Sequence, residues 1–214
     1  NLINGFFIGL STGASVVISQ HYGAGDRFGV KKAMVTNAVL ALILGILAVL
    51  VGVLCSPRLL RLIKTPETCI DNAILYAKIY FSGAIAIVIY NMGSGVLRAM
   101  GDSKRPLYFL IVTCFSNIIL DLFFVIVLDM GIAGVAIATV LSQCISAVLV
   151  AICVFRLPED IRPNLRSAAL DPMLLRRILL IGLPAGLQFI TFDLSNLLVQ
   201  SGINSFGDVT IAAW

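Results

Sequence analysis

The sequence predicts an all-α, polytopic integral membrane bundle, and its composition and its run lengths carry this prediction. Hydrophobic residues make up 59% of the 214 residues and charged residues only 12%, against roughly 25% charged in a soluble domain. The mean hydropathy is +1.04. The apolar residues gather in uncharged runs close to the ~20 residues that a membrane-spanning helix needs. We therefore expect a multi-pass protein of the cell membrane, with the lipid bilayer as its surroundings.

Six such runs and the start of a seventh are expected. They cover residues 1–20, about 33–56, about 79–97, 107–128, 130–155 and about 178–201, with the seventh from 209 onward. Pro57 is expected to end the second run, because proline lacks the N–H that a helix interior uses. The chain starts without Met and both of its ends lie in apolar runs. We therefore expect an internal piece of a longer protein.

The first run carries a row of small residues, Gly5, Gly9 and Gly13. Their four-residue spacing places them on one face of a helix, where a second helix can approach closely. The row therefore predicts a packing face rather than a binding site.

The connections between the runs predict the orientation. The first, third and fifth connections hold eleven of the fifteen Lys and Arg residues, and the alternate connections hold four. Because positive residues concentrate in cytoplasmic loops, the first set is expected on the cytoplasmic side. The net charge of +4 is thus explained by topology, and no nucleic-acid partner is expected.

The reactive side chains are too few and too scattered for an enzyme. There is one His, and the five Cys include no CxxC pair, so neither a disulfide framework nor a metal site is supported. No hydrolytic triad can be assembled from these residues. We expect no catalytic residues, no cofactor and no metal, apart from a coupling ion.

The fourth run contains a carboxylate, Asp121, and an amide, Asn117, one helical turn before it. A charged side chain in the hydrocarbon costs at least ~2.5 kcal/mol, so such residues normally face a water-filled cavity and bind something. Asn117 adds a neutral oxygen suited to Na⁺, or a partner for a protonated acid. The pair predicts a cation site; the alternative is a carboxylate paired with a neighbouring helix.

The sixth run combines a possible kink with several polar residues. Pro184 lies between Gly182 and Gly186, where a spanning helix can bend. The polar candidates that follow are Gln188, Asp193, Asn196 and Gln200. Gln188, Asn196 and Gln200 follow eight- and four-residue steps, so they predict a polar face toward a cavity, and hydrogen bonding between helices is the alternative.

Two loops carry a family resemblance. The sequence QHYGAGD at 20–26 resembles the Q-x-x-G-A-G-D loop of multidrug and toxic compound extrusion (MATE) transporters. The sequence VLRAMGDSKRP at 96–106 is similar to that family's L-R-A-x-G-D-[ST]-x-x-P loop, and GLP at 182–184 resembles the start of its second half. The resemblance covers the whole chain in matching order.

The resemblance implies a fold of twelve helices in two lobes, with the site between repeated halves. The chain would then hold helices two to seven and the start of eight. Residues 1–155 would belong to the first lobe, 156–177 to a cytoplasmic linker, and 178–214 to the start of the second lobe.

The resemblance also implies site residues. Similar archaeal and bacterial members bind the coupling cation with an Asn and an Asp on helix five and a Thr on helix six, together with an Asp on helix one, which precedes this chain. Asn117 and Asp121 match the first pair, and Thr139 falls where the Thr is expected. Other members carry a Glu on helix seven, and Asp193 lies one residue out of register with it.

The function that the resemblance implies is export of organic cations or drugs in exchange for H⁺ or Na⁺, by a monomer. The alternative in the same superfamily is a flippase for lipid-linked oligosaccharide. A flippase would need arginines within the spans, and every Arg here lies in a loop or at the edge of a run. A membrane-embedded lipid-modifying enzyme would need clustered Asp residues near the interface, whereas Asp121 and Asp193 lie in separate runs.

Overall fold

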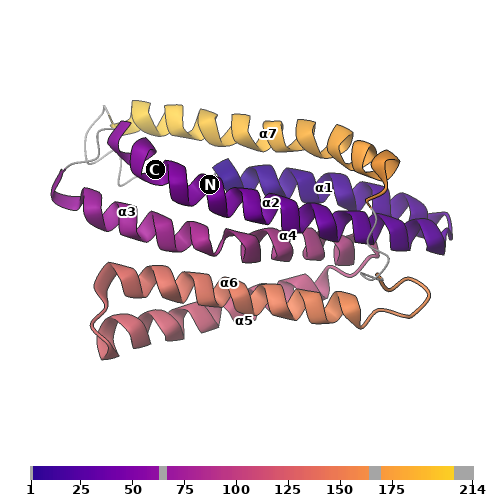
Figure 1. Ribbon diagram of the computed structural model, residues 1–214, viewed down its shortest axis with the longest axis horizontal. Helices are drawn as coiled ribbons and strands as arrows, with labels where there is room; N and C mark the ends of the chain where they lie inside the picture. The colour runs from indigo at the N-terminus through magenta and orange to yellow at the C-terminus, as the bar shows by residue number, and fades with distance from the viewer. Residues whose placement is uncertain (1, 63–66, 164–169, 205–214) are drawn as a thin grey trace.

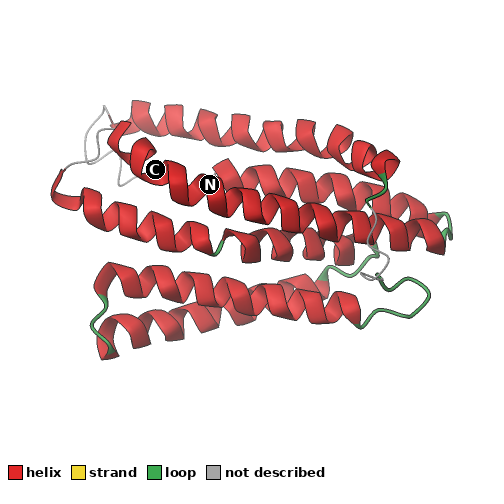
Figure 2. Ribbon diagram, in the orientation of Figure 1, coloured by secondary structure: helices red, strands yellow, loops and turns green. Residues whose placement is uncertain are grey.

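The computed structural model describes residues 2–62, 67–163 and 170–204, and within these residues the chain is helical apart from short loops and turns (Figure 2). The elements are α1 (Leu2–Gly23), α2 (Arg27–Leu62), α3 (Glu67–Ser82), α4 (Ala84–Ala99), α5 (Lys104–Leu122), the π-helical turn η1 (Phe123–Val127), α6 (Gly131–Phe155) and α7 (Pro172–Asn204). The predicted all-α class is confirmed.

Four helical stretches among the described residues are long and apolar enough to cross a membrane: Arg27–Leu62, Lys104–Val127, Gly131–Phe155 and Pro172–Asn196. The bent pair Ile70–Ser82 and Ala84–Ala99 raises the number to five if it forms one span. The first predicted run corresponds to α1, which is not among them. The run predicted from residue 209 onward lies outside the described residues.

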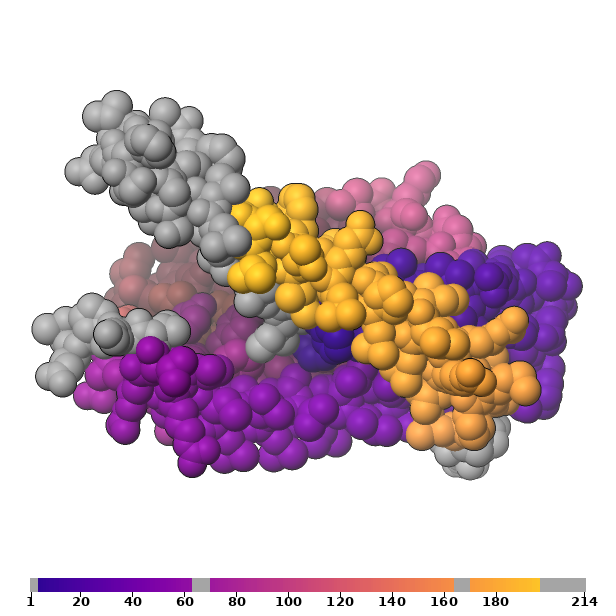
Figure 3. All heavy atoms as spheres, turned by 90° about the horizontal axis from the view of Figure 1, so that it is seen from above, coloured from indigo at the N-terminus to yellow at the C-terminus, as the bar shows by residue number. Residues whose placement is uncertain are grey.

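The helices pack side by side with their long axes roughly aligned (Figure 1). α7 lies along one face, α5 and α6 form the opposite face, and α1, α2 and α4 lie between them. Figure 3 shows the first of these faces, with α7 crossing it diagonally. The bundle therefore separates α7 from the α5–α6 hairpin.

The core centres on α1. Leu10, Val17 and Ile18 are almost completely buried, because α1 has α7 on one side and α4 and α2 on the others. Two hydroxyls join α1 to α4: Ser11 Oγ donates to the carbonyl of Asn91 over 2.6 Å, and Ser15 Oγ to that of Gly95 over 2.9 Å. Small hydroxylated residues thus let two backbones approach and hold them together.

The glycine row of α1 packs on α7, which confirms the predicted packing face. A Cβ added at Gly9 would overlap the backbone of Gly186, and one added at Gly13 would lie 2.5 Å from the carbonyl oxygen of Ile178. From the other side, a Cβ on Gly182 would lie 3.0 Å from Cα of Leu10. Because glycines face each other from both helices, the two backbones are in direct contact.

The prediction that Pro57 ends the second helix is wrong, since α2 continues to Leu62. The missing N–H of Pro57 leaves the carbonyl of Val53 without its usual helical partner. Ser56 Oγ lies 3.5 Å from that carbonyl oxygen and is buried. A hydroxyl of this kind can replace a lost backbone bond, so the helix continues through proline.

The predicted third run, 79–97, is in fact a bent pair. α3 and α4 meet at an angle of 43°, and the break is at Gly83, where an added Cβ would lie 2.8 Å from both methyl groups of Val140 on α6. Asp71 and Lys78 are charged, so the uncharged run predicted from the sequence begins only at about residue 79, whereas α3 begins at Glu67. Similarly, α7 begins at Pro172 rather than at 178, because Asp171 caps it.

The three connections predicted to be cytoplasmic lie together. Figure 1 shows the α1–α2, α4–α5 and α6–α7 connections at one end of the bundle and the α5–α6 connection at the other. Ion pairs join the first and fifth connections, between Arg27 and Asp160 and between Lys32 and Asp171. The positively charged connections thus share one end of the molecule.

Candidate functional site

Asn117 and Asp121 lie one turn apart on α5, and both are half-buried. Among the described residues, Nδ2 of Asn117 and Oδ1 of Asp121 are buried and have no hydrogen-bond partner. A buried polar atom normally has a partner, and leaving one unpaired is costly. Oδ1 of Asp121 is an acceptor that a small cation or a proton would satisfy, whereas Nδ2 of Asn117 is a donor, so Asn117 would offer its oxygen after a turn of the amide.

A π-helical turn, η1, begins at Phe123, two residues after Asp121. The N–H of Leu128 bonds to the carbonyl of Phe123 over 3.1 Å, five residues back. Such turns are rare and are often found at functional sites. Here the turn also fits the close packing of the hairpin, because a Cβ added at Gly134 of α6 would lie 3.0 Å from Cβ of Phe124.

Thr139 lies on α6, which packs against α5. Its hydroxyl donates to the carbonyl of Val135 over 2.9 Å. No hydrogen bond joins Thr139 to Asn117 or Asp121 within the described part of the chain. Its role as a third ligand therefore stays a prediction that rests on the family resemblance.

The polar face predicted for α7, made of Gln188, Asn196 and Gln200, stays a prediction, and Asp193 is placed differently from Gln188 and Asn196. Asp193 is half-buried and turns toward α1, with its Oδ2 3.4 Å from the Cβ position of Gly5. Gln188 and Asn196 are exposed, and the side chain of Gln200 lies outside the described residues. Since α7 and α5 lie on opposite faces of the bundle (Figure 1), the fold does not bring Asp193 to Asp121.

Sequence reasoning missed the role of three aspartates at the positively charged end. Asp26 Oδ1 accepts from the N–H of Gly29 over 2.9 Å, and Asp102 Oδ1 from the N–H of Arg105 over 3.1 Å. Asp171 Oδ1 accepts from Met173 and Leu174, over 3.0 and 3.2 Å. Each of them caps the first turn of a helix, and the available signal was an aspartate in the short connection that precedes each predicted run.

The two family-like loops have the same backbone structure. Gly25 and Gly101 have positive φ angles of 73° and 85°. The N–H groups of the aspartates that follow them, Asp26 and Asp102, bond five residues back, to His21 and Leu97, both over 3.0 Å. This is a glycine-ended helix terminus, and the aspartate that follows the glycine caps the next helix. The shared G-D pair is explained by this turn rather than by a ligand.

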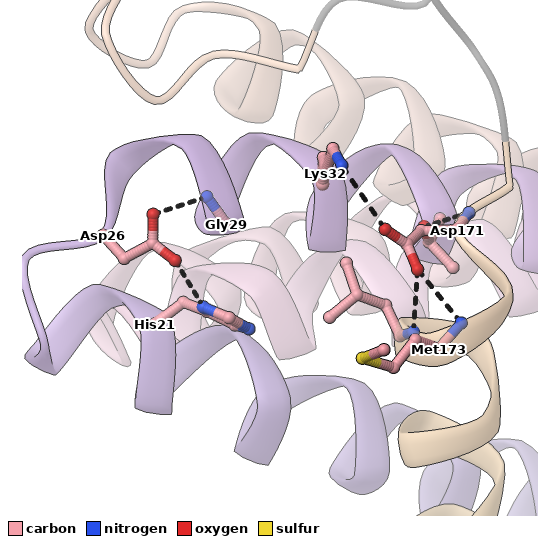
Figure 4. A network of polar contacts seen from close by, with 8 residues as sticks. His21, Asp26, Gly29, Lys32, Asp171 and Met173 are labelled. Carbon is pink, nitrogen blue, oxygen red and sulfur yellow. Dashed lines mark hydrogen bonds and ion pairs between the residues drawn. The ribbon is translucent and has the colours of Figure 1, made fainter.

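The polar network at this end is drawn in Figure 4. His21 Nδ1 lies 2.9 Å from Asp26 Oδ2, so the only His of the chain holds the α1–α2 turn. The N–H of Gly29, and then the hydrogen bond with His21, hold the pKa of the Asp26 carboxyl below its usual range. The N–H of Leu174 does the same for the pKa of Asp171.

Comparison with known proteins identifies the family. The MatE family model matches residues 1–123. The probable multidrug resistance protein YpnP of Bacillus subtilis (strain 168) is 36% identical over 214 residues, which cover 98% of this chain and 46% of that protein. The chain thus spans about half the length of the curated relatives that it matches.

Solved structures point to the same family. The inward-facing and the outward-facing conformations of a multidrug resistance MATE family transporter of the MOP superfamily both have a TM-score of 0.86 and 29% identity, over 94% of this chain and 46% and 45% of theirs. The arrangement of these helices therefore fits both conformations equally well. These relatives are named as transporters rather than enzymes, as the sequence predicted. The described helices and these matches together show that the chain is a multi-pass membrane protein of the MatE family.

Proposed function

We propose that the protein of which this chain is part exports organic cations or drugs in exchange for H⁺ or Na⁺, by alternating access. The observation that carries the proposal is the buried carboxylate oxygen of Asp121, which has no hydrogen-bond partner in the described part of the chain and lies one turn from Asn117 inside an apolar helix. The names of the relatives, which include multidrug resistance proteins, support the substrate class.

The chemistry of the pair suits a small cation. A carboxylate and an amide offer the oxygen ligands that a hard cation prefers. A proton on Asp121 would instead be donated to the amide oxygen of Asn117 after a turn of that amide. Either ion neutralises the buried carboxylate, so its binding and release can alternate with that of a cationic substrate.

The proposal divides the chain between two lobes: residues 1–155 in the first, 156–177 in a linker and 178–214 at the start of the second. In this division the contact of α1 with α7 joins the lobes. The described structure adds nothing in favour of the flippase alternative. Arginines on the described helices lie within two turns of a helix end. They are Arg27, Arg58, Arg61, Arg98, Arg105, Arg176 and Arg177.

The test uses the full-length protein in inverted membrane vesicles, with uptake of ethidium driven in turn by a pH gradient and a Na⁺ gradient. We expect gradient-driven uptake in the wild type and its loss in Asp121→Asn. Cys114→Ser, an exposed position on the same helix, is the matched control and should transport normally.

The outcomes separate the parts of the proposal. Full uptake by Asp121→Asn overturns Asp121 as the coupling residue, and the same assay with Asp193→Asn then tests the second candidate. No uptake by the wild type under either gradient overturns the exporter and favours the flippase. The gradient that drives uptake names the ion.

A further inference from the structure

An open apolar groove runs along the outside of the α5–α6 hairpin, which forms the face of the bundle opposite α7 (Figure 1). The groove has a volume of about 420 Å³. Two of its lining residues, Leu141 and Val148, are 40% and 55% exposed, and a third, Cys144, is exposed as well. The other described lining residues are Leu120, Ile145 and Leu149. The groove is therefore accessible from outside the bundle.

The groove is separate from the candidate cation site. Neither Asp121 nor Thr139 is among the described residues that line it. The exposed lining residues of α6 follow three- and four-residue steps, so they share one face of that helix. Thr139 lies two residues before Leu141, which turns it to the other side.

The positively charged end of the hairpin lies close to one end of the groove. Arg105, in the first turn of α5, places its Nη1 3.4 Å from Sγ of Cys153 on α6. Lys104 begins α5, and Arg156 stands at the C-terminal end of α6, one turn after Cys153. Three cations therefore come from the two helix ends that meet here.

These cations are only partly neutralised. Asp102 Oδ2 lies 3.1 Å from Nε of Arg105. The thiol that Nη1 contacts is a weak acceptor, so the guanidinium keeps donors for a stronger one. Lys104 and Arg156 are exposed and form no ion pair within the described part of the chain. A planar guanidinium with free N–H groups suits a phosphate.

Exposed aromatic residues lie directly beside the cations. Tyr108 follows Lys104 by one turn and is 60% exposed, and Phe155, next to Arg156, is 43% exposed. Amphipathic aromatic rings, Tyr and Trp above all, gather where the headgroups of a membrane meet its hydrocarbon. The headgroup level is therefore expected at this end of the hairpin.

The length of the groove fits one leaflet of a bilayer. Leu149 and Leu141 mark its extent along α6 and lie four and twelve residues from Cys153. At 1.5 Å per residue, they lie roughly 6 and 18 Å from it along the axis. Half of a ~30 Å hydrocarbon core is about 15 Å. An acyl chain whose headgroup lies at Arg105 would thus extend along the groove.

We propose that the outside of the α5–α6 hairpin binds an anionic phospholipid, with its phosphate at Lys104, Arg105 and Arg156 and one acyl chain in the groove. Charge complementarity favours this occupant. An apolar helix laid in the groove would leave the three cations without a counter-charge, and a zwitterionic lipid would bring a cation of its own to them. The site does not depend on the proposed exporter function.

The test uses the full-length protein with Ile152→Trp, in phosphatidylcholine nanodiscs. Ile152 is 44% exposed and lies one turn from Val148, so the new ring stands beside the groove rather than in it. Phosphatidylglycerol or phosphatidylcholine with the same dibrominated acyl chain is added in increasing fraction. Bromine quenches tryptophan at contact, and the fluorescence gained over the protein without Ile152→Trp reports which lipid lies there. We expect half of the quenching at an about fivefold or more lower fraction of the brominated phosphatidylglycerol.

Two double variants locate the preference. Added to Ile152→Trp, the pair Arg105→Gln and Arg156→Gln removes two of the three charges and should bring the two lipids to within about twofold of each other. The matched control pair, Arg176→Gln and Arg177→Gln, removes the same charge from exposed positions on α7, across the bundle (Figure 1). It should leave the preference unchanged.

Four results would overturn the proposal. Quenching by neither lipid would mean that another part of the protein covers the groove, and equal quenching by both would mean ordinary solvation by the bilayer. An unchanged preference in the Arg105 and Arg156 pair, or an equal loss in both pairs, would rule out a site at the hairpin. The comparison of the two lipids on Ile152→Trp alone decides even if a double variant fails to fold. Since no step measures transport, failure here leaves the proposed exporter function untouched, and the reverse also holds.

Discussion

Lys32 on α2 places its Nζ 3.5 Å from Oδ2 of Asp171, while Oδ1 of the same carboxylate caps the first turn of α7 (Figure 4). One side chain thus starts a helix and joins it to a neighbour. The N–H of Asp171 also donates to Oγ1 of Thr36, over 3.4 Å. Asp171 therefore fixes where α7 begins relative to α2.

Substitutions should separate these roles. We expect Asp171→Ala to lower the melting temperature of the full-length protein clearly, because two N–H groups lose their acceptor. Lys32→Met should lower it little, since both partners of the ion pair are partly exposed and such pairs contribute weakly. Asp171→Asn, which keeps a capping oxygen, should fall between them. Thermal melts followed by circular dichroism give the order, and a larger effect of Lys32→Met would contradict this account.

The glycine row of α1 can be tested with a single methyl group. In Gly9→Ala the added Cβ overlaps the backbone of Gly186, so α1 and α7 must move apart. We expect this to lower the free energy of unfolding by roughly 1–3 kcal/mol or more. Gly23→Ala adds the same methyl at the end of α1, where nothing lies within 4 Å. Equal melting temperatures of the two variants would show that the helices can separate at no cost.

The turn at Gly101 depends on a positive φ angle of 85°. Gly101→Ala should cost about 1 kcal/mol, because a Cβ is disfavoured in this region, and Gly101→Asn should cost less, because Asn adopts it more readily. Open space surrounds the Cβ position, so the difference reports backbone conformation alone. Chemical denaturation of the three proteins measures it, and equal stability of all three would refute the role of φ.

The lowered pKa of Asp26 predicts a dependence of stability on pH. The N–H of Gly29 and the His21 ring favour the ionised carboxylate in the folded state. The stabilisation is therefore present above the unfolded pKa of about 3.9 and is lost as the pH falls through the lower folded value. Melting temperatures should drop below about pH 4, and Asp26→Asn should reduce that drop. An identical pH profile for the variant would argue against a stabilising carboxylate.

Much of the fold follows from the sequence, because apolar run length and small-residue spacing are local properties. The helices, the glycine row as a packing face and the shared end of the positive connections were all predictable in this way, whereas the partner of that row, α7, was not. The continuation of α2 through Pro57 was not, since it depends on where the Ser56 hydroxyl points. The bend at Gly83 depends likewise on Val140, far away in the sequence.

The candidate cation site stays a prediction. The cost of a carboxylate in hydrocarbon singled out Asp121, and the buried atoms of Asn117 and Asp121 agree with that reasoning. The predicted polar face of α7 stays a prediction: Gln188 and Asn196 are both exposed, while Asp193 turns toward Gly5 on α1. A helix in a bundle has several neighbours, and sequence spacing alone does not say which of them a polar residue meets.

The glycine-ended turns at Gly25 and Gly101 also bear on how the chain assembles. The hydrogen bonds that close each turn join residues at most five positions apart, and the aspartate caps reach only three. Turns built from such local contacts form quickly and without distant partners. The α1–α2 and α4–α5 hairpins can therefore bend back on themselves as soon as their own residues emerge, before α7 is synthesised. The α1–α7 contact, between residues more than 160 positions apart, can form only after them.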